Sequence, residues 1–169
     1  MTSPALALAL ILTLFAALPL RAQGYAGLGS TAAEGFATPD PATRLSFPRD
    51  HGPHPDYRIE WWYLTATLSG PDGTDYGVQW TLFRSALAPG EAGGWASPQV
   101  WMGHAAATTP QHHFFAERLA RGGIGQAGVR TGPFAAWIDD WRMAGPDLST
   151  LRLRAQGAGF AYDLTLRSD

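Results

Sequence analysis

Two stretches of alternating apolar and polar residues flank a turn sequence, and this arrangement restricts the fold more than any other feature. The alternation runs through residues 58–69 and again through residues 74–87. Residues 71–73, Pro-Asp-Gly, suit a three-residue hairpin loop that ends in a left-handed glycine. That loop places Leu64 opposite Trp80, whereas a two-residue loop would turn the apolar side chains of one strand to the opposite face. The sequence therefore predicts an antiparallel β-hairpin in this register.

The predicted hairpin brings an acid and a base together on its apolar face. Glu60 falls opposite Arg84, at the end of the hairpin far from the turn. An ion pair in such surroundings has to be well paired or to contact a polar ligand. Glu60 also precedes Trp61 and Trp62, and apolar surroundings favour the protonated form of a carboxyl group. Because a proton donor beside indole rings could protonate an alkene, a structural ion pair and an acid catalyst both remain open.

The second half of the chain predicts further antiparallel strands. Residues 137–143 alternate, which places Asp139 beside Trp141 on an inward face. A loop at residues 145–147 would then pair Asp139 with Leu153. A second inward carboxylate would also suit glycoside hydrolysis, which uses two carboxyl groups.

Other local patterns complete the predicted topology. Residues 99–109 predict a strand, residues 110–120 a short helix or an irregular lid, and residues 157–158 a two-residue turn. About six strands with local connections are typical of an open or partial antiparallel barrel. Since a barrel that closes around a ligand needs about eight strands, we expect an all-β chain that a second domain or a second copy would complete.

Polar side chains gather just before the first predicted strand. Asp50, His51 and His54 stand within the segment FPRDHGPHPDYRIEWWY. The two histidines could bind a metal with His104 as a third ligand. The glycine and prolines between them make the segment extended, so no helix aligns the imidazoles, and we predict a loop with hydrogen-bonded imidazoles and no metal. Gln79 is a further polar candidate.

Composition excludes several classes of protein and indicates export. The chain has no cysteine, which rules out disulfides and thiolate chemistry, and its formal net charge of -2 predicts no nucleic-acid partner. Residues 5–20 form an apolar run without charge that is shorter than the roughly 20 residues that span a bilayer. We therefore expect a signal peptide over residues 1–22, with an uncleaved anchor as the alternative, a flexible linker over 23–44 and a domain over 45–169. This organisation predicts a secreted or periplasmic protein.

Several motifs in one order resemble a known family. FPRDHGPHPDYRIEWWY is followed by GVQWTLFRSAL, VWMGHAAAT, FFAERLAR and AAWIDDWRM. Over about residues 45–169 this order resembles the AttH / carotenoid 1,2-hydratase-like lipocalin family, and the chain looks like the first of that family's two lipocalin-like domains. The resemblance implies a lipocalin-like (calycin) barrel or partial barrel with an apolar pocket at the domain junction. It carries over these signature positions: Asp50, His51, His54, Glu60, Trp61, Trp62, Tyr63, Arg84, His104, Asp139 and Trp141.

The resemblance also implies a chemistry. For the hydratase it implies the addition of water to an isoprenoid double bond by acid catalysis, without a cofactor. We take Glu60, Asp139 and His51 as candidate catalytic residues, and expect this hydro-lyase activity where a complete second domain is present.

The remaining candidates would bind a hydrophobic lipid or isoprenoid, which is the expected partner. They are Asp50, His54, Trp61, Trp62, Tyr63, Gln79, Arg84, His104 and Trp141. Two alternatives remain open: a non-catalytic lipid carrier and a secreted hydrolase.

Overall fold

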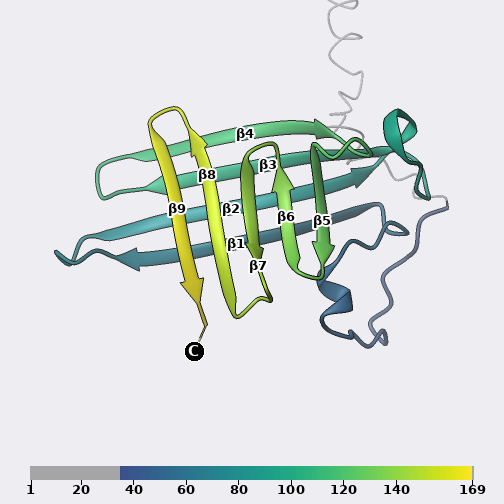
Figure 1. Cartoon of the computed structure of the whole chain (residues 1–169), viewed down its shortest axis with the longest axis horizontal. Helices are drawn as coiled ribbons and strands as arrows, with labels where there is room; N and C mark the ends of the chain where they lie inside the picture. Colours follow the sequence, from purple (N-terminus) through teal and green to yellow (C-terminus); the bar gives the residue numbers. More distant parts are fainter. Residues whose placement is uncertain (1–34, 169) are drawn as a thin grey trace, which may run out of the picture. The chain divides into compact units, whose positions relative to one another are not determined.

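The chain forms two antiparallel sheets in a computed structural model that describes residues 35–168 (Figure 1). The first sheet contains, in order, β1 Ile59–Ser69, β2 Asp75–Ala86, β3 Gln99–Thr108 and β4 His113–Arg121. The second sheet contains β5 Ala127–Thr131, β6 Phe134–Ile138, β7 Trp141–Gly145, β8 Thr150–Gly157 and β9 Phe160–Arg167. Within each sheet every strand pairs with its neighbour along the chain, and the strands of the second sheet run across those of the first.

The expected all-β antiparallel fold is confirmed, and the two sheets stay separate instead of closing into one barrel. Two short 3₁₀ helices, η2 at Arg49–His51 and η3 at Gly94–Ala96, lie in the connections. The predicted signal peptide and residues 23–34 of the predicted linker lie outside the described residues. Residues 35–44 contain no helix or strand, but Ala37 N donates a hydrogen bond to Asp56 O over 2.8 Å.

The predicted register of the first hairpin is confirmed along its whole length. Leu64 lies opposite Trp80, and Glu60 lies opposite Arg84. The three-residue loop ends at Gly73, whose φ of 79° is the left-handed conformation that this turn requires and that glycine adopts without steric cost. The alternation of apolar residues was sufficient here because a slip by one residue would expose the whole apolar face.

The prediction of a helix or lid over residues 110–120 is wrong. Residues 113–121 form β4, which pairs with β3 over its full length. Alternate β4 side chains turn inward, and among them Ala120 is buried and Ala116 packs against the core. The sequence prediction did not recognise the alternation of inward and outward side chains over residues 113–121.

The predicted inward position of Asp139 is also wrong. Asp139 and Asp140 form a two-residue turn between β6 and β7, and Asp139 has a φ of 51°. Aspartate tolerates this left-handed conformation because its short side chain bonds locally. The predicted strand over 137–143 is therefore two strands, and the next register shifts so that Met143, not Asp139, lies opposite Leu153.

The turn between β8 and β9 lies one residue later than predicted, at residues 158–159 instead of 157–158. Gly159 supplies the positive φ, at 83°. This moves the pairing by two positions, so that Leu153 faces Leu164. The apolar face survives the change because a shift of two residues preserves the side of the sheet on which each side chain lies.

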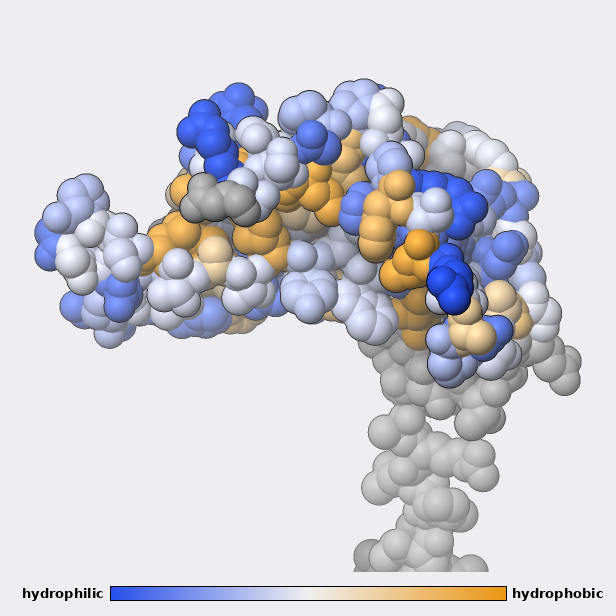
Figure 2. Space-filling view, turned by 90° about the horizontal axis from the view of Figure 1, so that it is seen from below, coloured by the Kyte–Doolittle hydropathy of each residue, from blue (hydrophilic) through white to orange (hydrophobic). Residues whose placement is uncertain are grey.

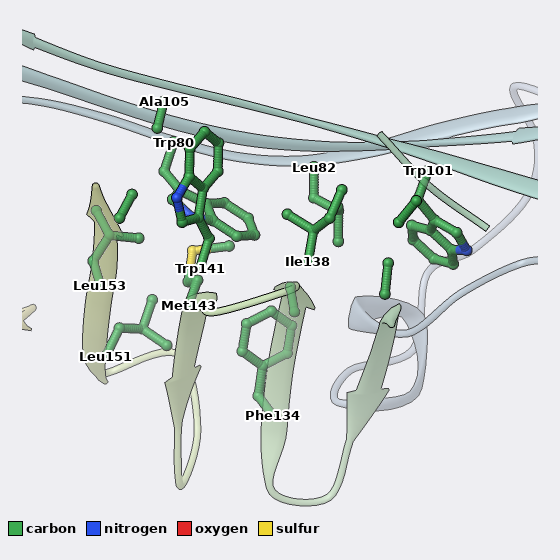
Figure 3. Packing of buried hydrophobic residues seen from close by; sticks show 14 residues of the cluster. Trp80, Leu82, Trp101, Ala105, Phe134, Ile138, Trp141, Met143, Leu151 and Leu153 are labelled. Carbon is green, nitrogen blue, oxygen red and sulfur yellow. The ribbon is translucent and has the colours of Figure 1, made fainter. Parts of the chain in front are cut away.

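The core fills the space between the sheets and is built from large side chains of both. Figure 3 shows Trp80 and Leu82 of β2 meeting Ile138 of β6 and Trp141 of β7. All four are fully buried. The sheets approach closely at Gly103, where a Cβ would lie 2.7 Å from Ile138 Cγ2. Shape complementarity at these contacts fixes how the sheets pack.

The two most buried tryptophans make different hydrogen bonds, which gives a stability prediction. Trp141 Nε1 donates to Gln156 O over 2.9 Å, whereas Trp80 Nε1 has no partner among the described residues. Trp141→Phe loses this bond, so we expect it to lower the free energy of unfolding by about 1 kcal/mol more than Trp80→Phe. Urea unfolding followed by far-UV circular dichroism measures the difference. A smaller loss for Trp141→Phe would contradict the assignment.

Candidate functional site

A pocket of about 580 Å³ lies between the free edge of β1 and the second sheet; we call it the β1 pocket. It is lined by Asp50, His51, Gly52, His54, Glu60, Trp61, Trp62, Tyr63, Leu64, Phe134, Met143, Leu148 and Leu151. Figure 2 looks at the molecule from the β1 side and shows a strip of hydrophobic residues open to solvent there. The second sheet supplies an apolar wall, and the loop before β1 supplies a polar end.

The polar end comes from residues 46–57, which fold back over the start of β1. Trp62 Nε1 donates to His51 O over 2.9 Å, and this bond fixes the loop to the strand. His51 stacks on Phe47 with their ring centres 4.3 Å apart. Gly52 lies so close to Thr131 that a Cβ would be 2.8 Å from Thr131 Cγ2, and a side chain there would push the loop away from β5.

A buried ion pair joins this loop to the first sheet. Arg84 Nε donates to Glu60 Oε2 over 2.8 Å, and the two side chains are 2% and 13% exposed. The guanidinium also donates to Gln99 Oε1 over 2.7 Å and to two carbonyl oxygens of the loop, His54 O at 2.9 Å and Tyr57 O at 2.6 Å. Every nitrogen of Arg84 thus has an acceptor, which a buried guanidinium requires.

Glu60 is equally well supplied with donors. Its oxygens accept from His54 N over 2.9 and 2.8 Å, and His54 Nδ1 lies 2.7 Å from Oε1. Together with Arg84 these donors surround the carboxylate. The arrangement confirms the predicted pairing of Glu60 with Arg84; a proton-donating role for Glu60 stays a prediction.

His54 lies between two carboxylates. Nδ1 faces Glu60, and Nε2 lies 3.7 Å from Asp50 Oδ1. The Arg49 guanidinium beside Asp50, together with the backbone N–H of Ser46, holds the pKa of Asp50 well below its usual range. Asp50 is therefore an anion at neutral pH, which makes it a poor proton donor and a suitable partner for a cation.

The predicted aromatic residues of β1 divide between the faces of the strand. Trp61 and Tyr63 point outward and are 57% and 64% exposed, yet both reach the rim of the β1 pocket. Trp62 points inward and stacks on Trp101, with ring centres 6.0 Å apart. These three residues join Asp50, His51, His54, Glu60 and Arg84 in one region.

The structure places the other predicted site residues elsewhere. Asp139 accepts from Gln126 Nε2 over 3.0 Å and from Arg118 Nη1 over 3.3 Å, in its turn. Trp141 is buried in the core beneath the Arg118 guanidinium. Gln79 and His104 line a separate depression of about 240 Å³ over β2, β3 and β4. The sequence prediction that grouped Asp139 with Glu60 is therefore wrong in geometry.

Sequence reasoning missed the apolar wall of the pocket and one of its polar supports. Phe134, Met143, Leu148 and Leu151 belong to the second sheet and its loops, and no local pattern indicates that they face β1. Gln99, which holds Arg84, has the same parity as the inward Trp101, so the alternation of β3 could have revealed it.

Two features are absent from the described residues. No group of three or more His, Asp or Glu side chains within residues 35–168 is arranged to hold a metal ion. In the same part of the chain, no helix is long and apolar enough to cross a membrane.

Comparison with known proteins places the chain in a family. The sequence model of the AttH-like family matches residues 38–169. A crystal structure of a Nitrosomonas europaea protein described as an AttH is similar to this chain, with a TM-score of 0.61 and 29% sequence identity over 77% of this chain. The match spans only 40% of that longer protein. No curated protein matches significantly. Because the family model covers well over half of its residues, this chain belongs to the AttH-like family.

Proposed function

We propose that this chain binds an apolar lipid or isoprenoid in the β1 pocket. The observation that carries the proposal is the combination of an apolar wall with a polar end in one groove. The volume of about 580 Å³ is in the usual range for small-molecule sites, and such sites place a few polar groups in a largely apolar lining.

The polar end suits the orientation of a ligand more than its protonation. Asp50 is held as an anion, and the oxygens of Glu60 already accept from Arg84 and His54. The exposed part of His54, whose side chain is 35% exposed, is the group most able to meet a hydroxyl or carbonyl of a ligand. Binding is therefore the function that this geometry supports best.

Acid-catalysed hydration of an isoprenoid is the second candidate, because the titratable groups border the apolar groove. In that reaction a proton adds to one alkene carbon, water adds to the other, and the water then loses a proton. We propose this chemistry only for a longer protein of the family. This chain matches 40% of the length of the solved example. Glycoside hydrolysis gains no support, since Asp139 does not line the pocket of Glu60.

We also propose that this chain is exported from the cytoplasm. The apolar run at residues 5–20 supports a signal peptide, and an exported protein with a pocket of this kind could collect or carry a lipid outside the cytoplasm.

Leu148→Gln tests the proposed binding, because Leu148 lines the pocket while it is 39% exposed, so that the fold should tolerate the change. We expect cis-parinaric acid to bind the chain, farnesol to displace it, and the variant to bind the probe about fivefold more weakly because apolar contact area is lost. The matched control is Leu87→Gln, at an exposed leucine outside the pocket. Equal affinities of the two variants, or no binding of the probe, would contradict the proposal.

A second readout separates the two candidates. Incubation with lycopene followed by mass spectrometry detects the addition of water. A gain of one water that Glu60→Gln abolishes would assign hydration to this chain, whereas binding without any gain assigns the role of a lipid carrier.

A further inference from the structure

The outer face of the five-stranded sheet carries a concentration of arginines. Met143, Leu151 and Leu153 point into the core, so their neighbours along β7 and β8 point outward. These outward positions include Arg142, Arg152 and Arg154, and Arg130 of β5 lies on the same face.

A groove of about 550 Å³ runs through these arginines. Its lining is Arg130, Pro133, Phe134, Arg142, Ala144, Gly145, Pro146, Arg152 and Arg154. The lining holds four guanidinium groups and no carboxylate, although the whole chain has a formal net charge of -2. The groove is therefore positively charged, although the chain as a whole is slightly acidic.

The pairing of strands brings like charges together at this groove. Arg142 lies directly opposite Arg154 on the neighbouring strand. Like charges in opposed positions of a sheet destabilise it. An anion bound between them would remove this repulsion.

One carboxylate partly compensates the cluster, from outside the groove. Asp163 accepts from Arg152 Nε and Nη2, both over 2.7 Å, and lies 3.1 Å from Arg154 Nε. Within residues 35–168, Arg130 and Arg142 form no ion pair or side-chain hydrogen bond. These two guanidinium groups are thus available to a ligand, and the Asp163 pairs hold the neighbouring pair of arginines in place.

We propose that this groove binds a phosphate group, with Arg130 and Arg142 as its principal donors. A planar guanidinium presents paired N–H donors that match two phosphate oxygens, and this geometry makes arginine the preferred residue for phosphate recognition. Pro133, Ala144 and Pro146 give the groove apolar surface beside the arginines, which suits a phosphate attached to an organic group. The site is separate from lipid binding in the β1 pocket and does not depend on it.

The phosphate could belong to a soluble compound or to a lipid headgroup, and two probes distinguish these sources. Inorganic pyrophosphate, titrated calorimetrically against the full chain at low salt in a buffer without phosphate, represents the soluble source. Vesicles of phosphatidylcholine with phosphatidic acid, tested by co-sedimentation against pure phosphatidylcholine, represent the headgroup.

Neutral substitutions at the two free arginines test the site. We expect Arg130→Gln and Arg142→Gln each to weaken binding of the responding probe about tenfold or more, because each removes charge-assisted hydrogen bonds. Arg44→Gln is the matched control, since it removes the same charge from an exposed arginine outside the sheets. Circular dichroism verifies that the variants are folded.

Each result decides the proposal. Loss of pyrophosphate binding in both groove variants, with the control unaffected, establishes a site for a soluble phosphate; the same pattern with anionic vesicles alone establishes a headgroup site. Absence of binding to both probes, unchanged binding by the groove variants, or an equal loss in Arg44→Gln would overturn it. Binding of farnesol is measured separately, so failure here leaves the β1 pocket proposal intact.

Discussion

Arg84→Met is expected to lower the free energy of unfolding by about 3–5 kcal/mol. Methionine keeps much of the volume but supplies no donor, so Glu60 becomes a largely buried carboxylate without its counter-ion. Gln99 Oε1 and the carbonyls of His54 and Tyr57 lose their donors in the same step. Urea unfolding measures the loss, and limited proteolysis should show earlier cleavage in residues 46–57, which Arg84 ties to the sheet.

Two comparisons test whether burial of the ion pair causes the loss of stability in Arg84→Met. Arg152→Met removes a guanidinium that makes two hydrogen bonds to Asp163 on an exposed face, and we expect little change in melting temperature, because exposed ion pairs contribute little. The double variant Arg84→Met with Glu60→Leu should recover part of the stability, since it leaves no unpaired charge in the interior. An Arg84→Met variant as stable as the parent chain would show that the pair is not needed by the fold.

Gly103→Val is expected to destabilise the chain by about 3 kcal/mol, the upper end of the usual cost of overpacking. Even the first added carbon would lie 2.7 Å from Ile138 Cγ2 and 3.3 Å from Trp141 Cε3. Both neighbours are fully buried and cannot move aside without disturbing the packing of the two sheets. Thermal unfolding followed by circular dichroism gives the measurement.

Gly93→Ala serves as the control because nothing lies within 4 Å of its added Cβ. We expect that variant to unfold within a degree or two of the parent chain, since surface changes are usually within about 0.5 kcal/mol. Comparable losses in the two glycine variants would mean that the sheets do not meet at Gly103.

Sequence patterns predicted those parts of the fold that depend on local alternation. The hairpin of β1 and β2 follows from the apolar face of its two strands and from the turn at residues 71–73, and its register placed Glu60 opposite Arg84. Asp139 was misplaced because a turn of two residues does not interrupt the alternation of apolar and polar residues. The sequence pattern therefore gives no indication of the turn between β6 and β7. The left-handed backbone at Asp139 is favoured by the local chemistry of aspartate but is not required by it.

Contacts between the sheets could not be predicted in the same way. The wall that Phe134 and Leu151 give to the β1 pocket depends on how one sheet lies across the other, which is decided by close packing at positions such as Gly103. The loop bonds of Arg84 to His54 and Tyr57 likewise join residues far apart in the sequence. The sequence indicated which residues were polar and close to β1, but not that they would satisfy one another.

Within each sheet, the pairing of every strand with its neighbour along the chain has a kinetic consequence. Each ladder closes a short loop, which costs little chain entropy, so either sheet can form without waiting for distant segments. Contacts between the sheets, such as the docking of Trp80 and Leu82 against Ile138 and Trp141, require the two halves to meet. We therefore expect the late barrier of folding to lie in the expulsion of water between two preformed layers, and Gly103 to be a place where that step is sensitive to substitution.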